Sequence, residues 1–202
     1  MSKELDQLVA YIEENADGYF LKGTHDLGGL LNKLFSNPDT LNSESQRVFF
    51  LLSMRCYPLF EYTLKNRDLK TIPELLRYSL LSKCFYSDGR VVTPMTFAKE
   101  VDALISDSDQ DWYENQVVDY RIFNLRYKIL ENSTLDLEIL EDQFENSGDV
   151  TDIRAILDNP NCPSEFLEQI VDSDHHVFEE RENLELIEIA KKILASRKSN
   201  TE

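Results

Sequence analysis

The sequence predicts an all-α fold, in which a multi-helix N-terminal bundle precedes stacked pairs of helices that form a short, solenoid-like array. Three observations lead to this class. Apolar residues recur every three to four positions through nearly every segment, which is the spacing of a core-facing helix. Only the stretch 90–93 resembles a strand, and it is too short and isolated to form a sheet. The last third of the chain repeats itself at a fixed offset, as stacked helical units do.

The first two helices are predicted from an apolar stripe and from helix breakers. Leu5, Leu8, Val9 and Ile12 have the spacing i, i+3, i+4 and i+7 of a core-facing helix at the start of the chain. A glycine-rich connection follows and leads into a helix over residues 30–35. Pro38 ends that helix, because proline disfavours the α conformation of the residue before it.

Two capping boxes predict where the next helices begin. Ser43 with Gln46 precedes one apolar run, and Thr71 with Glu74 precedes another. A Thr-Pro pair at residues 93–94 opens a further short helix. The helix after Thr71 would bury Leu75, Leu76, Leu80 and Leu81. The short helix after the Thr-Pro pair would bury Phe97, Val101 and Leu104.

Charge is distributed unevenly along the chain. Residues 1–100 contain 12 Lys and Arg against 13 Asp and Glu, a net charge of −1. Residues 101–202 contain 9 against 25, a net charge of −16. We therefore predict a nearly neutral helical bundle over residues 1–106 and an acidic, repeat-like region over residues 107–202, either as two domains or as one continuous body.

An acidic stretch lies at this boundary. Asp107, Asp109 and Asp111 alternate as at the start of an EF-hand loop, but Trp112 replaces the required glycine and Val118 replaces the bidentate glutamate. The stretch is therefore interpreted as an acidic helix start and not as a calcium site. The aromatic and basic residues that follow recur at helical intervals within a negative region, which favours core packing over a platform for nucleic-acid bases.

The repeat aligns residues 129–144 with residues 156–171 at an offset of 27 and without a gap. In each copy a helix ends, a short turn follows, and a second helix begins. The first turn of this second helix contains a pair of apolar residues that is expected to be buried. We expect stacked helical pairs over residues 129–194. The matched positions include Ile129 and Ile156, Leu130 and Leu157, Glu131 and Asp158, Asn132 and Asn159, Glu138 and Glu165, Leu140 and Leu167, and Glu141 and Glu168.

The string Asn159-Pro160-Asn161-Cys162-Pro163-Ser164-Glu165-Phe166-Leu167 resembles the asparagine–proline turn of the variant leucine-rich repeat, a relative of HEAT repeats in architecture. The resemblance covers about residues 129–194. It implies two short helices per unit, one of them in 3₁₀ form in some units, stacked into a right-handed array. It implies nothing about activity.

A last helix is expected over residues 182–196. Glu188 and Lys192 form an i, i+4 pair on it in the favourable order. The inward stripe of this helix would consist of Leu184, Ile187 and Ala190, closed by Ile193 or Leu194.

The sequence offers no catalytic or metal-binding constellation, and we expect no enzyme, no cofactor and no metal. His175 with Glu179, or His176 with Glu180, supplies two ligands where a catalytic zinc needs three protein groups. Six glycines form no phosphate-binding or nucleophile motif. The paired carboxylates have polar neighbours, which suits solvated groups and not general acids.

The composition also excludes several environments and partners. Cys56, Cys84 and Cys162 lie far apart, so neither a disulfide framework nor a metal knuckle is expected. No apolar run spans a bilayer, and the N-terminus has no secretory signal pattern, so a cytoplasmic protein without membrane contact is expected. The net charge of −17 excludes unaided binding to a phosphate backbone.

These features predict a non-enzymatic protein–protein interaction module, an adaptor or inhibitor whose acidic helical surface engages a basic protein partner. Mimicry of DNA, as in small acidic proteins of viral or mobile-element origin, is one form of this function. The alternative is a structural component of a larger assembly, whose acidity only confers solubility. The oligomeric state stays open. The predicted partner-binding residues are Asp107, Asp109, Asp111, Glu179 and Glu180.

Overall fold

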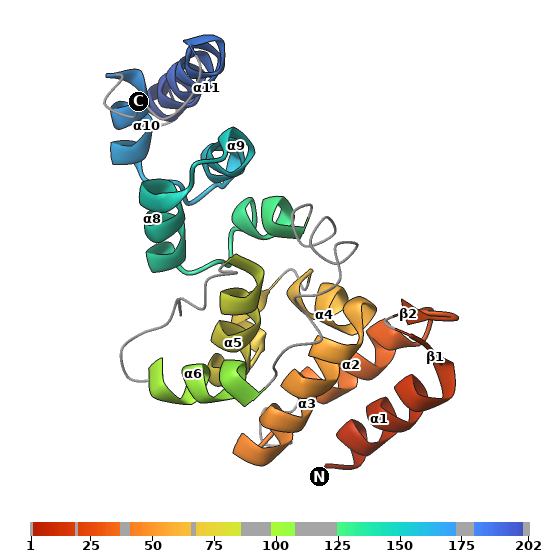
Figure 1. The fold of residues 1–202 in the computed structure, drawn as a ribbon. Coiled ribbons are helices and arrows are strands. Elements are labelled where there is room, and N and C mark those ends of the chain that lie inside the picture. The colour runs from red at the N-terminus through yellow and green to blue at the C-terminus, as the bar shows by residue number, and fades with distance from the viewer. Residues whose placement is uncertain are drawn as a thin grey trace. The chain divides into compact units, whose positions relative to one another are not determined.

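The computed structural model confirms the all-α class (Figure 1). In the part of the chain that it describes, the only sheet pairs two strands of two residues each. Backbone contacts divide the chain into two units, Met1–Leu125 and Arg126–Glu202. The described residues are 2–18, 20–36, 41–65, 68–85, 98–107, 125–172 and 180–199.

The first helix of unit 1, α1 (Lys3–Asn15), buries Leu5, Leu8 and Ile12 of the predicted stripe, whereas Val9 stays partly exposed. The Ser2 hydroxyl caps it by accepting a hydrogen bond from the third helical residue. A hairpin that the sequence did not predict follows, with strands β1 (Ala16–Asp17) and β2 (Phe20–Leu21). Gly18 adopts a φ of 63° in this turn, a left-handed conformation that glycine tolerates without steric cost.

Helices α2 (Leu27–Phe35) and α3 (Ser43–Arg55) differ from the prediction at their starts. Helix α2 begins one turn before the predicted residue 30. The cap of α3 is Asn42, whose Oδ1 accepts a hydrogen bond from the Ser45 N–H at 2.9 Å. The predicted cap at Ser43 is therefore wrong, because Ser43 is already the first helical residue.

The remainder of unit 1 surrounds α5 (Glu74–Phe85), which is buried at every position from Leu76 to its end. Of its predicted stripe, only Leu75 stays partly exposed. Thr71 lies in the preceding 3₁₀ turn, where its hydroxyl donates a hydrogen bond to the Asp68 carbonyl. The other elements of the unit are α4 (Tyr57–Leu64), η2 (Leu69–Thr71) and α6 (Ala98–Asp107).

Helix α6 buries Val101 and Leu104 as predicted and ends at the predicted domain boundary. The contact division lies farther along the chain, between Leu125 and Arg126. The strand-like stretch 90–93, the Thr-Pro pair that follows it and Phe97 lie outside the described residues.

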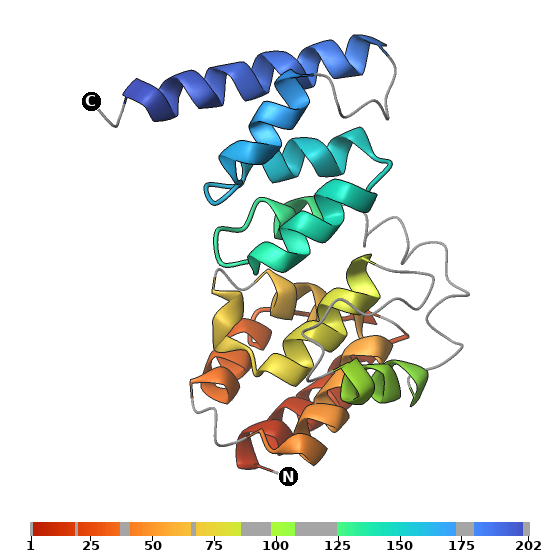
Figure 2. The same cartoon turned by 90° about the vertical axis from the view of Figure 1, so that its left-hand side faces the viewer.

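Unit 2 consists of short helices and one long one. Helix α8 contacts α9, and the long α11 packs against α10 and α9 (Figure 2, where α11 is dark blue). The helical segments are residues 125–130, α8 (Leu137–Asn146), α9 (Val150–Asp158), α10 (Ser164–Val171) and α11 (Glu180–Ser199).

The predicted inward stripe of α11 is wrong in part. Leu186 and Ala190 are buried, whereas Leu184 is 59% exposed and Ile187 is only partly covered. Apolar residues occur around most of this helix, so its periodicity allows more than one inward face.

Candidate protein-binding surface

The two copies of the sequence repeat contain the same turn. In each, the backbone N–H of an asparagine bonds to the carbonyl three residues earlier, and its side-chain oxygen accepts from the N–H two residues later. These distances are 3.0 and 2.9 Å for Asn132, and 3.1 and 2.8 Å for Asn159. The helices that follow, α8 and α10, begin at Leu137 and Ser164, which are also 27 positions apart.

The second turn is hydrogen-bonded to the first. The Asn159 side-chain amide donates to the carbonyls of Leu130 and Asn132 at 2.7 and 3.0 Å. Asn161 donates to the Ser133 carbonyl at 2.6 Å. Asn159 is buried, so its amide supplies donors that water cannot provide. The asparagine that closes its own turn therefore also fixes that turn against the preceding one.

Helices α8 and α10 contact each other through a pair of aromatic rings. The rings of Phe144 on α8 and Phe166 on α10 are parallel to within 4°, with centroids 4.2 Å apart. Both rings are buried, together with Leu140 and Leu167 at matched positions of the repeat. The stacked rings therefore join two helices that each carry carboxylates on their exposed faces.

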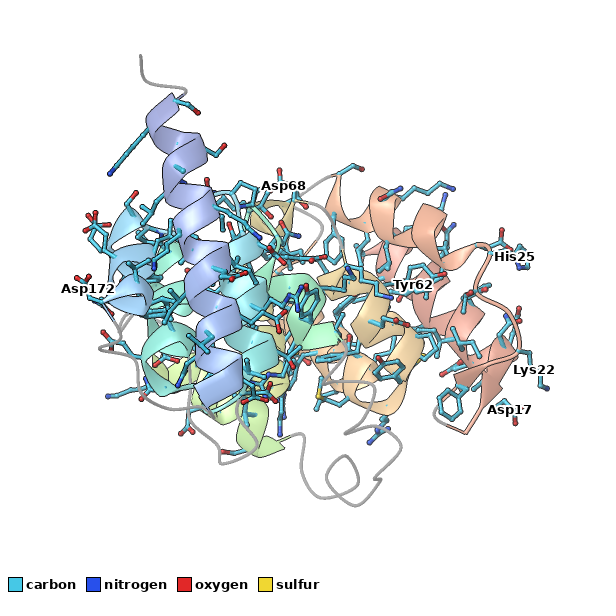
Figure 3. All side chains as sticks on the ribbon, turned by 90° about the horizontal axis from the view of Figure 1, so that it is seen from above. Asp17, Lys22, His25, Tyr62, Asp68 and Asp172 are labelled. Atoms are coloured by element: carbon cyan, nitrogen blue, oxygen red, sulfur yellow. The ribbon has the colours of Figure 1, made fainter. Side chains whose placement is uncertain are left out.

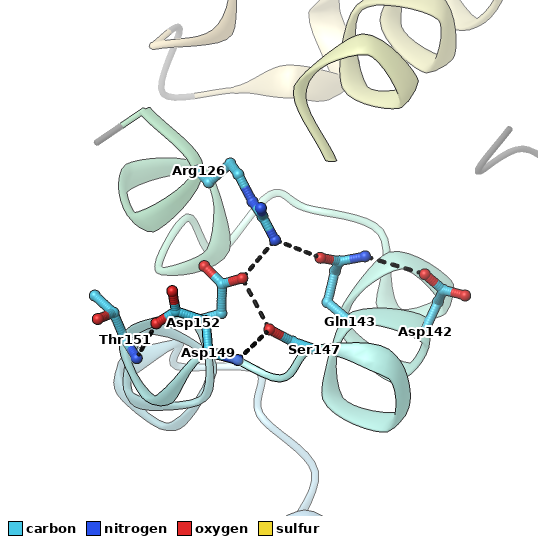
Figure 4. A network of polar contacts seen from close by, with 7 residues as sticks. All are labelled: Arg126, Asp142, Gln143, Ser147, Asp149, Thr151 and Asp152. Carbon is cyan, nitrogen blue, oxygen red and sulfur yellow. Dashed lines mark hydrogen bonds and ion pairs between the residues drawn. The ribbon is translucent and has the colours of Figure 1, made fainter. Parts of the chain in front are cut away.

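A polar network fixes α8 and α9 to the helix at residues 125–130 (Figure 4). The Arg126 guanidinium binds the Asp152 carboxylate and donates to the Gln143 side-chain carbonyl at 3.3 Å. The Ser147 hydroxyl donates to the same carboxylate at 2.9 Å. Burial raises the pKa of Asp152, while Arg126 and Ser147 oppose this shift. The network is enclosed by protein, so we interpret it as structural.

The exposed faces of α8 and α10 carry a repeated set of carboxylates, which we call the acidic surface. Within each helix these side chains occupy positions i, i+3 and i+7, opposite the buried face. Each carboxylate of α8 has its counterpart 27 residues later, and all six are exposed. The acidic surface consists of Glu138, Glu141 and Glu145 on α8, of Glu165 and Glu168 on α10, and of Asp172, the C-cap residue of α10.

No cation of the described residues neutralises the acidic surface. Neither α8 nor α10 contains Lys or Arg. The ion pairs of the described part of unit 2 lie elsewhere, for example between Arg154 and Glu185 at 2.9 Å. Asp172 lies at the outer edge of α10 (Figure 3). Unit 2 as a whole contains 8 Lys and Arg against 19 Asp and Glu, a net charge of −11.

A recess of about 410 Å³ lies between α9 and α11 in the same unit. Its lining includes Tyr127, Arg154, Asp158 and Glu185. Burial raises the pKa of Tyr127, and the Asp158 carboxylate, which accepts a hydrogen bond from the Tyr127 hydroxyl at 3.3 Å, raises it further. Three carboxylates and one arginine line the recess, so it is less acidic than the acidic surface, which contains no cation.

The structure describes few of the residues predicted to bind a partner. Asp107 is the last residue of α6 and Glu180 is the first of α11. Asp109, Asp111 and Glu179 lie outside the described residues, as do the two histidine positions considered for zinc. These five residues therefore stay a prediction.

The acidic surface was missed for an identifiable reason. The alignment at an offset of 27 already paired Glu138 with Glu165 and Glu141 with Glu168. Extending it by one helical turn pairs Glu145 with Asp172 and completes an exposed face of three carboxylates per helix. The prediction instead chose acids that are adjacent or alternate in the sequence, and it did not look for acids that recur at helical spacing in both copies of the repeat.

The chain also offers little else on which to base an assignment. Cys56, Cys84 and Cys162 are buried free thiols. Within the described ranges, no group of three His, Cys, Asp or Glu side chains is placed to hold a metal ion, and no helix there has both the length and the apolar character that crossing a bilayer requires. Comparisons with protein-family models, curated proteins and solved structures found no match.

Proposed function

We propose that this chain is a non-enzymatic protein–protein interaction module, an adaptor or inhibitor that engages a basic protein partner through the acidic surface. The observation that carries the proposal is the repetition of one exposed carboxylate face on two adjacent helices, without a neutralising cation among the described residues. A set of carboxylates needed only for solubility has no reason to recur at matched positions of a repeat. We retain the variant leucine-rich or HEAT-like array as the proposed architecture of unit 2.

The physical role of such a surface is to accelerate association. Exposed charges contribute little to the stability of a complex, because water and salt screen them. A patch of one sign nevertheless steers an oppositely charged partner at long range and raises the association rate constant by one to three orders of magnitude. The proposal therefore predicts effects on association that exceed those on dissociation.

Mimicry of DNA is a narrower form of the same proposal. Along each helix the carboxylates are separated by rises of about 4.5 and about 6 Å, so each helix presents a row of negative charges. A nucleic-acid-binding protein with Lys and Arg in its groove is a partner of suitable charge. If duplex DNA competes with the chain for its partner, mimicry is supported; simultaneous binding restricts the function to an adaptor.

The test begins with capture of the partner from the native host, and association is then measured with three variants, of which the first two change the net charge equally. The first replaces Glu138, Glu141, Glu165 and Glu168 by Lys. The second makes the same replacement at four exposed acids of unit 1, Glu13, Glu14, Asp17 and Asp102. The third reverses the five residues predicted from sequence, Asp107, Asp109, Asp111, Glu179 and Glu180.

We expect the first variant to associate at least about tenfold more slowly than the wild type at low salt, with a much smaller change in dissociation. The association rate constant of the second variant should fall by less than about threefold. Equal losses in the first two variants would mean that only the net charge matters. Unchanged association of the first variant would favour the alternative, a structural component whose acidity serves solubility.

A further inference from the structure

Helix α11 presents a partly uncovered apolar seam beside the face that packs against α9 and α10, about 100° around the helix from Leu186 and Ala190. Leu186 and Ala190 are buried, on the side of the helix that packs against α9 and α10. Leu184, which is 59% exposed, begins a second row with the spacing 3, 4, 3. This row, which we call the α11 seam, consists of Leu184, Ile187, Lys191 and Leu194, each partly or fully exposed.

Acidic residues are concentrated in the first half of α11 and basic residues in its second half. Residues 180–189 contain four glutamates and one arginine, whereas residues 190–199 contain four cations and no acid. An antiparallel copy of such a helix places each acidic half beside a basic half. The spacing of the seam is that of the core positions of a two-helix coiled coil. The spacing of the α11 seam and the distribution of charge along α11 therefore both favour a second, antiparallel copy of the same helix.

We propose that α11 docks a second copy of this chain, in a symmetric antiparallel dimer. The two-fold axis lies near residue 189, so that Leu184 faces Leu194 of the partner and Ile187 faces Lys191 of the partner. The lysine stem covers the isoleucine, and its ammonium group reaches Glu188 of the partner. The symmetry produces each of these contacts twice.

The dimer is weak and is populated at high protein concentration. One pair of helices buries less than the roughly 1,200 Å² typical of stable interfaces. Two chains of net charge −17 also repel one another, although salt at about 0.15 M screens this repulsion beyond about 8 Å. Short-range pairing at the seam is screened less than this long-range repulsion.

Exchange of the two charged residues provides the test. Glu188→Lys places two lysines near each other across the axis, and Lys191→Glu does the same with two glutamates. The double variant restores opposite charges in reversed order. Lys192→Glu is the matched control, because it changes the net charge as Lys191→Glu does but lies about 100° farther around the helix.

The readout is sedimentation equilibrium of the full chain between about 5 and about 500 µM. We expect a reversible dimer for the wild type, at least fivefold weaker dimerisation for each single variant, and a return to within about twofold in the double variant. Leu184→Ser should weaken the dimer by about tenfold. Lys192→Glu should stay within about twofold of the wild type.

The Glu188→Lys variant distinguishes docking at the α11 seam from general electrostatic repulsion between the chains. This substitution reduces the negative net charge from −17 to −15. If only repulsion between chains mattered, the variant would associate more strongly, whereas docking at the α11 seam predicts weaker association. Stronger association of Glu188→Lys would overturn the proposal. A wild type that stays monomeric over the whole concentration range, or a folded double variant that is no better than the single ones, would overturn it too.

Discussion

At the scale of single residues, Asp152 shows how context determines what a charge does. It is 1% exposed, whereas the carboxylates of the acidic surface are all exposed. Arg126 and Ser147 bind its carboxylate, yet burial has the larger effect and raises its pKa. The ion pair therefore offsets only part of the desolvation of this group, as is common for buried ion pairs.

The raised pKa of Asp152 predicts a pH dependence of unfolding opposite to that of an ordinary salt bridge. Between the unfolded pKa of an aspartate, about 3.9, and the higher folded pKa, the native state binds more protons than the unfolded state. The contribution of Asp152 to stability is therefore present at low pH and is lost as pH rises through this window. Asp152→Asn removes this titration.

The measurement is urea denaturation of the wild type and of Asp152→Asn at pH values from about 3.5 to about 7. We expect the stability of the variant relative to the wild type to increase as pH rises. Glu141→Gln, which removes one exposed carboxylate from α8, is the charge-matched control. If the stability of Asp152→Asn relative to the wild type instead decreases as pH rises, the ion pair with Arg126 outweighs the desolvation of Asp152.

At the scale of elements, the sequence predicts a helix well where its apolar residues occupy one face only. The stripe of α1 is an example, because Leu5, Leu8 and Ile12 are buried on one face and Val9 flanks them. In α11, apolar residues at 184, 186, 187, 189, 190, 193 and 194 leave the inward face undecided, and packing against α9 and α10 decides it. The hairpin β1–β2 was missed because strands of two residues have no readable period.

Cap positions depend on which of two neighbouring polar residues is placed to accept from the helix. Asn42 and Ser43 both suit an N-cap, and the capping-box pattern selected Ser43. The backbone selects Asn42, which is extended at a ψ of 171°. The turn between copies was better predicted, because Asn132 and Asn159 stand at the same position in both. Their contact across the two turns was not predictable, since it depends on how the copies pack.

The contact between the turns predicts different costs for two asparagines. Asn159→Ala removes the donors of the buried Leu130 and Asn132 carbonyls, and should destabilise the protein by about 2 to 3 kcal/mol. Asn161→Ala removes one exposed bond and should cost less than about 1 kcal/mol. Denaturant unfolding of both variants provides the measurement. Equal costs would mean that burial does not make the bonds of Asn159 more important than the exposed bond of Asn161.

At the scale of the whole molecule, the distribution of charge follows the cations and not the acids. Each unit contains 19 Asp and Glu. Unit 1 has 13 Lys and Arg and a net charge of −6, whereas unit 2 has only 8 in a shorter segment and a net charge of −11. Part of the asymmetry predicted at residue 100 thus belongs to unit 1. Electrostatic self-repulsion grows with the square of charge, so it is on the order of threefold larger in unit 2.

This difference predicts that salt stabilises unit 2 more than unit 1. Raising NaCl from about 0.02 to about 0.5 M reduces the screening length from about 20 to about 4 Å. Hydrogen exchange resolves the two units, with the buried residues Ile153 and Leu167 reporting on unit 2, and Leu8 and Phe60 on unit 1. We expect the free energy of opening to rise by about 1 kcal/mol in unit 2 and by less than about 0.5 kcal/mol in unit 1.

A variant separates repulsion from other effects of salt. Replacing Glu138, Glu141, Glu165 and Glu168 by Gln lowers the net charge of unit 2 from −11 to −7, close to that of unit 1. If repulsion controls the response, this variant should lose most of the extra stabilisation at high salt and be more stable than the wild type at low salt. If the surface pair of Arg154 with Glu185 controls it, salt should instead weaken unit 2 in both proteins, since screening reduces the attraction of exposed pairs.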